Sequence, residues 1–276
     1  MARPRRRFGP LLRVTGLVAL VAVVSMPFWP AAHEQWTAWT LSRRLRDPVE
    51  SVRREAAERL VQLGAPATSW VIAAMGDRSP VVRRLACSIL PRTVPEKAGP
   101  AVAALAAASR DSDASVRAVA VEQLGTFVTG GPLRTEAASR DAALRAICAA
   151  LDDKAPRVRE AAGRTLWDLG SLAKSAVGDL DRALDGPDRS VRIYAAMTLL
   201  KFDRTAAQAR VAATLTPLLE DQSAPFNHWR AVHTLKNAIG EEALAAKLVA
   251  LLKHQDPATR RGALNDLTNH CPTATA

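Results

Sequence analysis

The stretch Asp111–Gly125 reads DSDASVRAVAVEQLG and is the clearest copy of a motif that recurs along the chain. An Asp opens it, Val116 follows five residues later, and Arg117, Ala120 and Leu124 come next. At about 100° per residue, positions 0, 4, 8 and 11 counted from Val116 fall within roughly 80° of arc on one helix face. The motif therefore predicts a turn followed by an amphipathic helix, with the Asp as its N-cap.

The motif occurs seven times, and each copy is placed by the residue at its position zero. These residues are separated by 30, 34, 42, 33, 36 and 32 positions, and a period of this size is typical of a solenoid of stacked helical hairpins. The sixth copy has a polar residue at position zero, and the seventh is shortened, with Asp256 close before its anchor. The seven anchors are Val52, Val82, Val116, Val158, Val191, Asn227 and Thr259.

A second helix is predicted between successive motifs, which gives one α-hairpin per repeat and about 13–14 helices in all. The long interval after Val116 contains Phe127–Arg134, where Gly-Gly-Pro breaks any helix and predicts a loop insertion. The expected second helices cover residues 66–75, 96–109, 135–151, 172–184, 204–219 and 241–253.

Together these copies resemble HEAT-like repeats, including the type found in phycobilin (PBS) lyases, over residues 47–270. The resemblance implies an all-α fold, an α-solenoid of about six to seven hairpins. It also implies that each Asp caps its own helix and meets an Arg of the adjoining repeat, forming a structural Asp–Arg ladder. The residues of this ladder are Asp47, Arg53, Asp77, Arg83, Asp111, Arg117, Asp153 and Arg159.

The N-terminal residues 1–32 have the composition of a signal or membrane-anchor segment. Five Arg lie within residues 1–13, and an uncharged run follows from Val14 to Trp29. That run alone is short of a bilayer core of about 30 Å, but residues 11–29 reach spanning length if Arg13 extends to the interface. We expect a single-pass anchor with a cytoplasmic N-terminus and extracytoplasmic repeats; the alternative is a cleaved signal and a secreted or periplasmic protein.

Next to this segment, residues 33–46 are predicted to form a helix that caps the array. Trp36, Trp39 and Leu45 would cover its open end, since terminal repeats need such a cover. The repeat array would span residues 47–270, and residues 271–276 would be a flexible tail.

Candidates for chemistry are few. Cys87, Cys148 and Cys271 form no Cys-x-x-Cys pair and are interpreted as small buried hydrophobes. His228 and His233 are five residues apart, roughly 140° around a helix, so no metal site is predicted there. No nucleotide-binding or nucleophile motif is present, so no catalytic residue and no cofactor is expected.

One local break in the array marks a candidate partner-binding surface: Asn227, His228, Trp229 and Arg230 stand where other copies have the regular pattern. A rule broken inside a regular array marks either a functional site or drift. Trp and Arg are common hot-spot residues at interfaces, which is why this surface is singled out.

Three functions fit the sequence. We expect a non-catalytic scaffold, membrane-tethered or exported, that binds a protein partner on its concave face. The alternative is a nucleic-acid-binding protein similar to HEAT-like DNA glycosylases, which would use an arginine stripe with Trp70, Trp167 and Trp229. The net charge of +11 falls to +6 without the five Arg of residues 1–13, which is modest for a nucleic-acid binder. The third function that fits the sequence is that of an enzyme similar to the phycobilin lyases.

Overall fold

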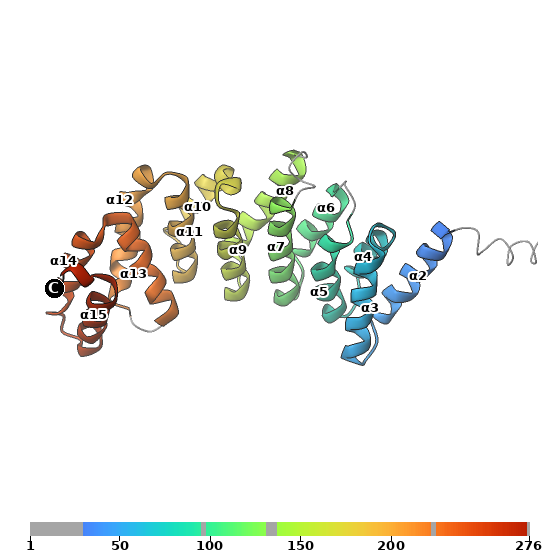
Figure 1. The fold of residues 1–276 in the computed structure, drawn as a ribbon, viewed down its shortest axis with the longest axis horizontal. Helices are drawn as coiled ribbons and strands as arrows, with labels where there is room; N and C mark the ends of the chain where they lie inside the picture. The colour runs from blue at the N-terminus through green and yellow to red at the C-terminus, as the bar shows by residue number, and fades with distance from the viewer. Residues whose placement is uncertain (1–29, 95–97, 131–136, 222–224, 275–276) are drawn as a thin grey trace, which may run out of the picture. The chain divides into compact units, whose positions relative to one another are not determined.

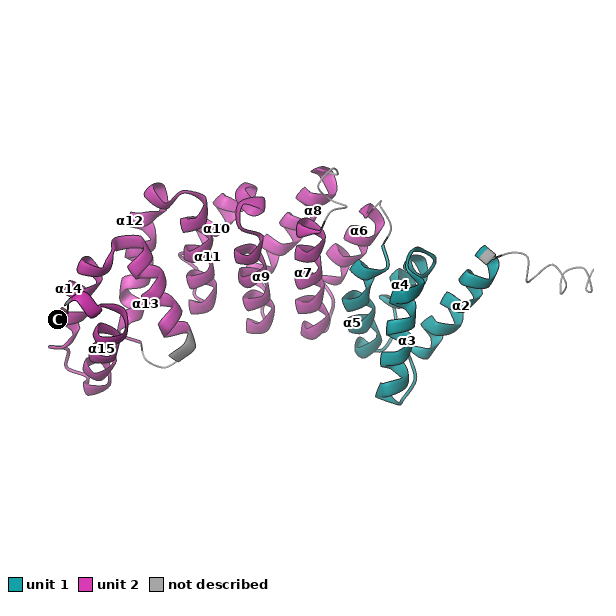
Figure 2. Ribbon diagram, viewed as in Figure 1, with its two compact units in different colours: residues 1–95 teal, residues 96–276 magenta. Residues whose placement is uncertain are grey.

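A computed structural model describes residues 30–94, 98–130, 137–221 and 225–274. Within these ranges every regular element is an α-helix or a short 3-10 turn, and there is no strand, as the repeat pattern predicts. The chain divides into two compact units, residues 1–95 and residues 96–276 (Figure 2).

Unit 1 holds the first two repeat motifs and one helix before them (Figure 1). We call a helix that carries the motif a motif helix, and a helix between two motifs a second helix. The elements of unit 1 are α2 (Pro30–Arg44), motif helix α3 (Glu50–Leu63), η2 (Ala65–Ala67), second helix α4 (Thr68–Ala74), motif helix α5 (Pro80–Ile89) and η3 (Leu90–Arg92).

Unit 2 alternates the two kinds of helix over its described residues. Motif helices α7, α9 and α11 lie side by side in one layer, and α8 and α10 lie in the other (Figure 1). The motif helices are α7 (Ala114–Thr129), α9 (Pro156–Leu169), α11 (Arg189–Phe202), α13 (Pro225–Ile239) and α15 (Pro257–His270). The second helices are α6 (Gly99–Ala108), α8 (Ala137–Ala149), α10 (Val177–Ala183), α12 (Arg204–Leu215) and α14 (Glu241–Leu251), with 3-10 turns η5 (Ala150–Asp152), η6 (Gly170–Ala176), η7 (Thr216–Leu219) and η8 (Pro272–Ala274).

The apolar positions of the motif form the core of each unit. Leu60, Leu90, Leu124 and Leu166 occupy position eight of their copies, and each is 0% exposed. Burying one such side chain contributes roughly 1.5–3 kcal/mol to folding. The predicted amphipathic face is therefore confirmed as the face that packs the two layers together.

Small residues let neighbouring motif helices approach closely. A Cβ placed on Gly125 would lie 2.4 Å from Thr165 Cγ2, and one on Gly163 would lie 2.9 Å from Tyr194 Cβ. Glycine at these two positions therefore brings α7 against α9 and α9 against α11. The short distance between these motif helices brings together the side chains on the side of their layer that faces away from the second helices.

The leading Asp of the motif is not the helix N-cap, which corrects the sequence prediction. It lies two residues before the N-cap, and its Oδ1 accepts the backbone N–H of that residue, so that it closes the turn instead. The turn is thus two residues longer than the motif spacing suggested. The four bonds are Val49 N–H to Asp47 (2.9 Å), Ser79 N–H to Asp77 (2.9 Å), Asp113 N–H to Asp111 (2.8 Å) and Ala155 N–H to Asp153 (2.8 Å).

Other Asp residues do act as N-caps. Asp113, Asp188 and Asp256 each accept N–H groups of the first helical turn. Asp256 is therefore equivalent to Asp113, and the seventh copy is not shortened. His254 stands in its leading position, where Nδ1 accepts the Asp256 N–H at 3.1 Å.

Two further predictions are corrected by the structure. Leu45, directly after α2, is buried, but Trp36 and Trp39 of α2 are 57% and 37% exposed, so these two side chains do not form the predicted cover. The predicted loop insertion is partly helix, because α7 continues to Thr129 and buries Phe127 and Val128. Residues 131–136 of that insertion lie outside the described residues.

The predicted C-terminal tail and the predicted N-terminal anchor can be compared with the described residues. Cys271 is buried and Thr273 donates its N–H to Glu241 at 3.0 Å, so this part of the predicted flexible tail is held in place. The predicted anchor, residues 1–29, lies outside the described residues. Among the helices that are described, none combines the length and the apolar composition that crossing a bilayer requires.

Candidate functional site

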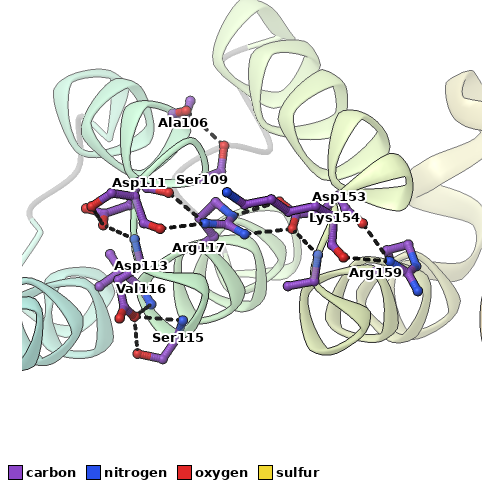
Figure 3. A network of polar contacts seen from close by, with 12 residues as sticks. Ala106, Ser109, Asp111, Asp113, Ser115, Val116, Arg117, Asp153, Lys154 and Arg159 are labelled. Carbon is purple, nitrogen blue, oxygen red and sulfur yellow. Dashed lines mark hydrogen bonds and ion pairs between the residues drawn. The ribbon is translucent and has the colours of Figure 1, made fainter.

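The Asp–Arg ladder is best formed around Arg117, in the third motif (Figure 3). Its Nε and Nη2 donate to the two carboxylate oxygens of Asp153, at 2.7 and 2.8 Å. Its Nη1 donates to two carbonyls of its own turn, Asp111 O at 2.8 Å and Ser112 O at 3.1 Å. One guanidinium therefore closes a turn and joins that turn to the next repeat.

The same Nη1 geometry explains the six-residue interval between Asp and Arg. In five copies Nη1 of the motif Arg donates to the carbonyls six and five residues earlier, which are the carbonyls of the turn. The arginines are Arg53, Arg83, Arg117, Arg159 and Arg260.

The bonds to the adjoining repeat are less regular than the turn bonds. Arg159 Nε lies 2.7 Å from Asp188 Oδ2, and Asp188 is also the N-cap of α11, because Gly186 occupies the leading position. In unit 1 the first pair differs from the prediction: Asp77 is met by Arg46, whereas Arg53 donates to its own turn. Arg46 follows α2, and its side chain is 58% exposed, whereas those of Arg117 and Arg159 are 6% and 22% exposed.

Burial and hydrogen bonding have opposite effects on the pKa of the ladder carboxyl Asp153. Burial alone would raise the pKa of Asp153, but hydrogen bonds from Arg117 and from the Ala155 N–H outweigh it and hold that pKa below its ordinary value. The hydrogen bond to Asp153 likewise raises the pKa of Arg117. Arg117 and Asp153 therefore form a fixed pair of opposite charges that joins two repeats.

A second set of contacts holds the C-terminal ends of the motif helices. Lys201 Nζ of α11 donates to Trp167 O of α9 at 2.9 Å, and Lys236 Nζ of α13 donates to His270 O of α15 at 2.6 Å. Arg204, at the start of α12, donates to Asn237 O of α13. Cations at helix C-termini satisfy carbonyls that have no partner within the helix and interact favourably with the helix dipole.

The four candidate residues of the sixth motif do not form one surface, because neighbouring residues on a helix point about 100° apart. Asn227 Nδ2 donates to Ser190 Oγ at 2.8 Å. His228 is 5% exposed, and Arg230 lies over the Tyr194 ring at 4.9 Å and donates to its hydroxyl. Only Trp229, at 51% exposed, is open to a partner.

His228 joins α13 to α15. Its Nε2 lies 2.7 Å from Asp266 Oδ2, and its Nδ1 lies 3.2 Å from Asp221 O. His270, on α15, is also buried, and burial lowers its pKa. Among the described residues no group of three or more His, Cys, Asp or Glu side chains is arranged to hold a metal ion.

Trp229 belongs to a wider surface on the outward side of the motif helices. Positions 2, 6 and 9 of the motif lie opposite the core positions 0, 4 and 8. On α13 these are Trp229, His233 and Lys236, and the Trp229 and His233 rings stack with centroids 5.4 Å apart and planes 5° apart. The surface of α9, α11 and α13 made by these positions is named the motif face below.

On α11 the motif face is apolar. Ile193 is 1% exposed, and Met197 and Leu200 are half-buried, although all three lie on the side of α11 away from Val191, Ala195 and Leu199, which face the core. On α9 the same positions are Glu160, Arg164 and Trp167. Lys201 Nζ stands 4.1 Å from the Trp167 ring centroid, so a cation lies between the aromatic residue of α9 and the apolar strip of α11.

Met197 and Leu200 were not among the residues predicted from the sequence. The signal was present, because positions 2, 6 and 9 can be read in every copy once position zero is fixed. The fifth copy is apolar at all three, unlike the fourth and the sixth. Because the core positions of the fifth copy are regular, only its outward positions distinguish it from the other copies.

The three cysteines are interior residues, as expected. Cys87, Cys148 and Cys271 are free thiols and are all buried. Burial raises the pKa of Cys148 to about 12, and Asp179 adds to this effect. A thiol of this kind is inert at neutral pH.

Comparisons with known proteins agree with this fold. The family model described as HEAT repeats matches residues 37–125 and 178–268, more than half of the chain. The structure of the archaeal HEAT-like repeats protein from Thermococcus onnurineus NA1 is similar, with a TM-score of 0.51, 14% sequence identity, and coverage of 84% of this chain and all of that one (100%).

Two other solved structures are similar at lower scores. A designed armadillo repeat protein in complex with the peptide (KR)4 has a TM-score of 0.41 and 17% identity, over 83% of this chain and 97% of that one. An engineered protein has a TM-score of 0.45 and 19% identity, over 84% and 67%. Among curated proteins, none matches the sequence. Because the family model matches these two segments, which make up more than half of the chain, the chain belongs to the HEAT-repeat family.

Proposed function

We propose that the chain is a non-catalytic scaffold that binds a protein partner on the motif face of unit 2. One observation carries the proposal: an exposed Trp, stacked on His233, shares this face with an apolar strip on the neighbouring motif helix. Trp229 is 51% exposed, and Met197 and Leu200 are half-buried. A rigid aromatic side chain beside recessed aliphatic ones is typical of a protein-binding hot spot.

The ladder supports a scaffold because it repeats. A catalytic group is needed once, whereas the Nη1-to-turn contact recurs in five copies across both units. The same contacts weaken the nucleic-acid alternative, because that hypothesis uses the motif arginines as a phosphate-binding stripe. The donors of Arg117 are bound to Asp153 and to turn carbonyls, and its side chain is 6% exposed.

Site-specific photo-cross-linking tests the binding face. A photoreactive amino acid would replace Leu200 on α11 or Trp229 on α13 in the full chain. The control would replace Gln208, an exposed residue of α12 in the other layer. We expect adducts of one defined size from the two motif-face positions and none from the control. Equal cross-linking from all three positions, or from the control alone, would contradict the proposed face.

We further propose that residues 11–29 tether the array to a membrane, with the repeats on the extracytoplasmic side. The support is the composition of the segment, five Arg followed by the uncharged run from Val14 to Trp29. A C-terminal tag would be probed with protease in intact cells and in cells whose inner membrane has been opened. Digestion only after that membrane is opened would overturn the proposed topology.

A further inference from the structure

We propose that one side of helix α2 lies in the headgroup region of a bilayer; this rests on the membrane tether proposed above for residues 11–29. The first observation is that two indole rings of α2 are open to solvent. Trp36 and Trp39 are 57% and 37% exposed, although the sequence predicted them as a cover for the array. Trp, with an apolar body and one polar N–H, is enriched where an apolar phase meets water, as at a membrane surface.

Both rings lie on the side of α2 that faces away from the rest of unit 1. Ala38 and Leu41 mark the side that packs into unit 1, at 0% and 6% exposed. At about 100° per residue, Trp36, Trp39 and Arg43 fall within roughly 60° of arc, centred roughly 160° from the packed side. We call these three residues the Trp stripe. A bilayer in contact with the Trp stripe would leave the packing of α2 intact.

The Trp stripe lies close to the end of the proposed anchor. Helix α2 begins at Pro30, directly after residues 11–29. Trp36 and Trp39 are therefore about 9 and 14 Å from the start of α2, at about 1.5 Å per residue along the helix. The headgroup region on one side of a bilayer is only about 5–8 Å deep. An upright α2 would carry both rings out of that region, so both stay in it only when α2 lies along the membrane surface.

The charges of α2 suit this orientation. Arg43 lies over the Trp39 ring, with its guanidinium carbon 5.1 Å from the ring centroid, so the cation and the ring occupy the same level. Glu34 is the only acidic residue of α2, and it lies roughly 170° around the helix from the Trp stripe. No carboxylate of α2 would therefore enter the headgroup region. The two rings carry the contact, and the guanidinium beside them adds attraction to lipid phosphates.

The tether favours lipid over a protein partner as the occupant. Residues 11–29 would hold α2 at the bilayer surface, so contact of the Trp stripe with lipid is in effect intramolecular and needs no second association. A soluble partner would have to displace lipid from the same two rings. In the purified full chain, detergent around residues 11–29 would cover the Trp stripe in place of lipid, so Trp36 would be equally shielded in cells and after purification.

Fluorescence quenching by labelled lipid tests this inference on the full chain, reconstituted into vesicles of phosphatidylcholine and phosphatidylglycerol. The variants Trp36→Cys and Trp39→Cys would each carry the fluorophore NBD, and the quencher is a lipid with a nitroxide close to its headgroup. The control is Arg84→Cys, at an exposed residue of α5, which packs on α3 and α4. The chain without an added cysteine shows whether the buried native thiols react. We expect a loss of NBD fluorescence at positions 36 and 39 and none at position 84.

A second substitution shows whether the rings hold α2 at the surface. Trp36→Ala, made in the Trp39→Cys chain, should reduce the quenching at position 39, because one of the two rings that enter the headgroup region is gone. Trp229→Ala is the matched control, since Trp229 is 51% exposed in unit 2, and it should leave that quenching unchanged. Both substitutions are at exposed positions, and circular dichroism checks that the helices are kept. Equal quenching in the two variants would overturn the inference.

Flotation of the vesicles in a density gradient separates the two proposals. If the full chain does not float with the vesicles, the tether fails and the inference fails with it. If the chain floats and the labels at positions 36 and 39 are quenched more strongly than the label at position 84, the inference is supported. If it floats and those two labels are quenched no more than the label at position 84, the inference is overturned and the tether stands.

Discussion

Removing the Arg117 side chain is the sharpest test of how the repeats are joined. The substitution Arg117→Ala deletes the pair with Asp153 and both bonds to the turn carbonyls. The two side chains are only 6% and 13% exposed, so Asp153 would be left as a partly buried carboxylate without its cation. Breaking such a pair from one side costs about 3–5 kcal/mol.

The matched variant is Arg46→Ala in unit 1. Arg46 also meets a leading Asp, Asp77, but its side chain is 58% exposed. Water can solvate both partners of an exposed pair, so its loss costs about 0–1 kcal/mol. The comparison separates the effect of burial from the effect of removing one Arg–Asp pair.

Urea unfolding followed by circular dichroism at equilibrium measures both variants. Since domains of this kind are stable by about 5–15 kcal/mol, the Arg117→Ala midpoint should fall by a large fraction and the Arg46→Ala midpoint should barely move. A stepwise transition would mean that the stack has divided at the weakened repeat. A loss below about 1 kcal/mol for Arg117→Ala, or equal losses in the two variants, would refute the argument from burial.

The remaining predictions concern packing, pH and thiol chemistry. Gly125→Ala should destabilise the chain by about 1–3 kcal/mol in the same urea assay, because its Cβ would clash with α9, whereas Gly178→Ala, with no atom within 4 Å, should leave stability unchanged or raise it by up to about 1 kcal/mol. The pKa values of His270 and Asp153 are both lowered, so the folded chain binds fewer protons than the unfolded one; stability should be full above about pH 7 and fall as pH drops below about 6.5, then again below about 4, and a midpoint that stays constant from pH 7 to 5 would contradict this. Because burial raises the pKa of Cys148 to about 12, a thiol reagent at pH 8 should not label it in the folded chain but should label it in urea, and mass spectrometry would detect early labelling if the prediction is wrong.

The core of this fold was predictable because it depends on a local period. Position zero and the residues four and eight places later are buried at Val116, Ala120 and Leu124, and the same holds at Val158, Ala162 and Leu166. The seven motif helices follow from this spacing alone. Even the degenerate sixth copy buries Ala231 and Leu235, although Asn227 replaces its anchor.

The turns were predicted less well, because their hydrogen bonds use backbone atoms that a sequence does not display. The Asp–Arg interval suggested a cap and a bond to the next repeat. In the structure the Arg also binds carbonyls of its own turn, and the Asp closes the turn before the cap. That Arg46, and not Arg53, meets Asp77 depends on the path of the chain after α2 and has no counterpart in the motif.

The candidate binding site was only partly predictable. The break in the sixth motif singled out Asn227, His228, Trp229 and Arg230 together. Of these, Trp229 is 51% exposed, whereas His228 is buried and Arg230 lies over the Tyr194 ring. Adjacent residues on a helix face different directions, and His228 faces Asp266 in the next motif helix. The apolar strip of α11 belongs to a regular copy, so a search for irregular copies passes over it.

In-cell oxidative footprinting tests the central claim most directly, because Met and Trp both react with hydroxyl radicals. Met197 and Trp229 lie on the motif face, and Trp36, in unit 1, is the control at 57% exposed. The account predicts that Met197 and Trp229 are oxidised more slowly in cells than in the purified chain, with Trp36 unchanged relative to an internal standard. Equal oxidation of Trp229 in the two settings would show that no partner covers the motif face.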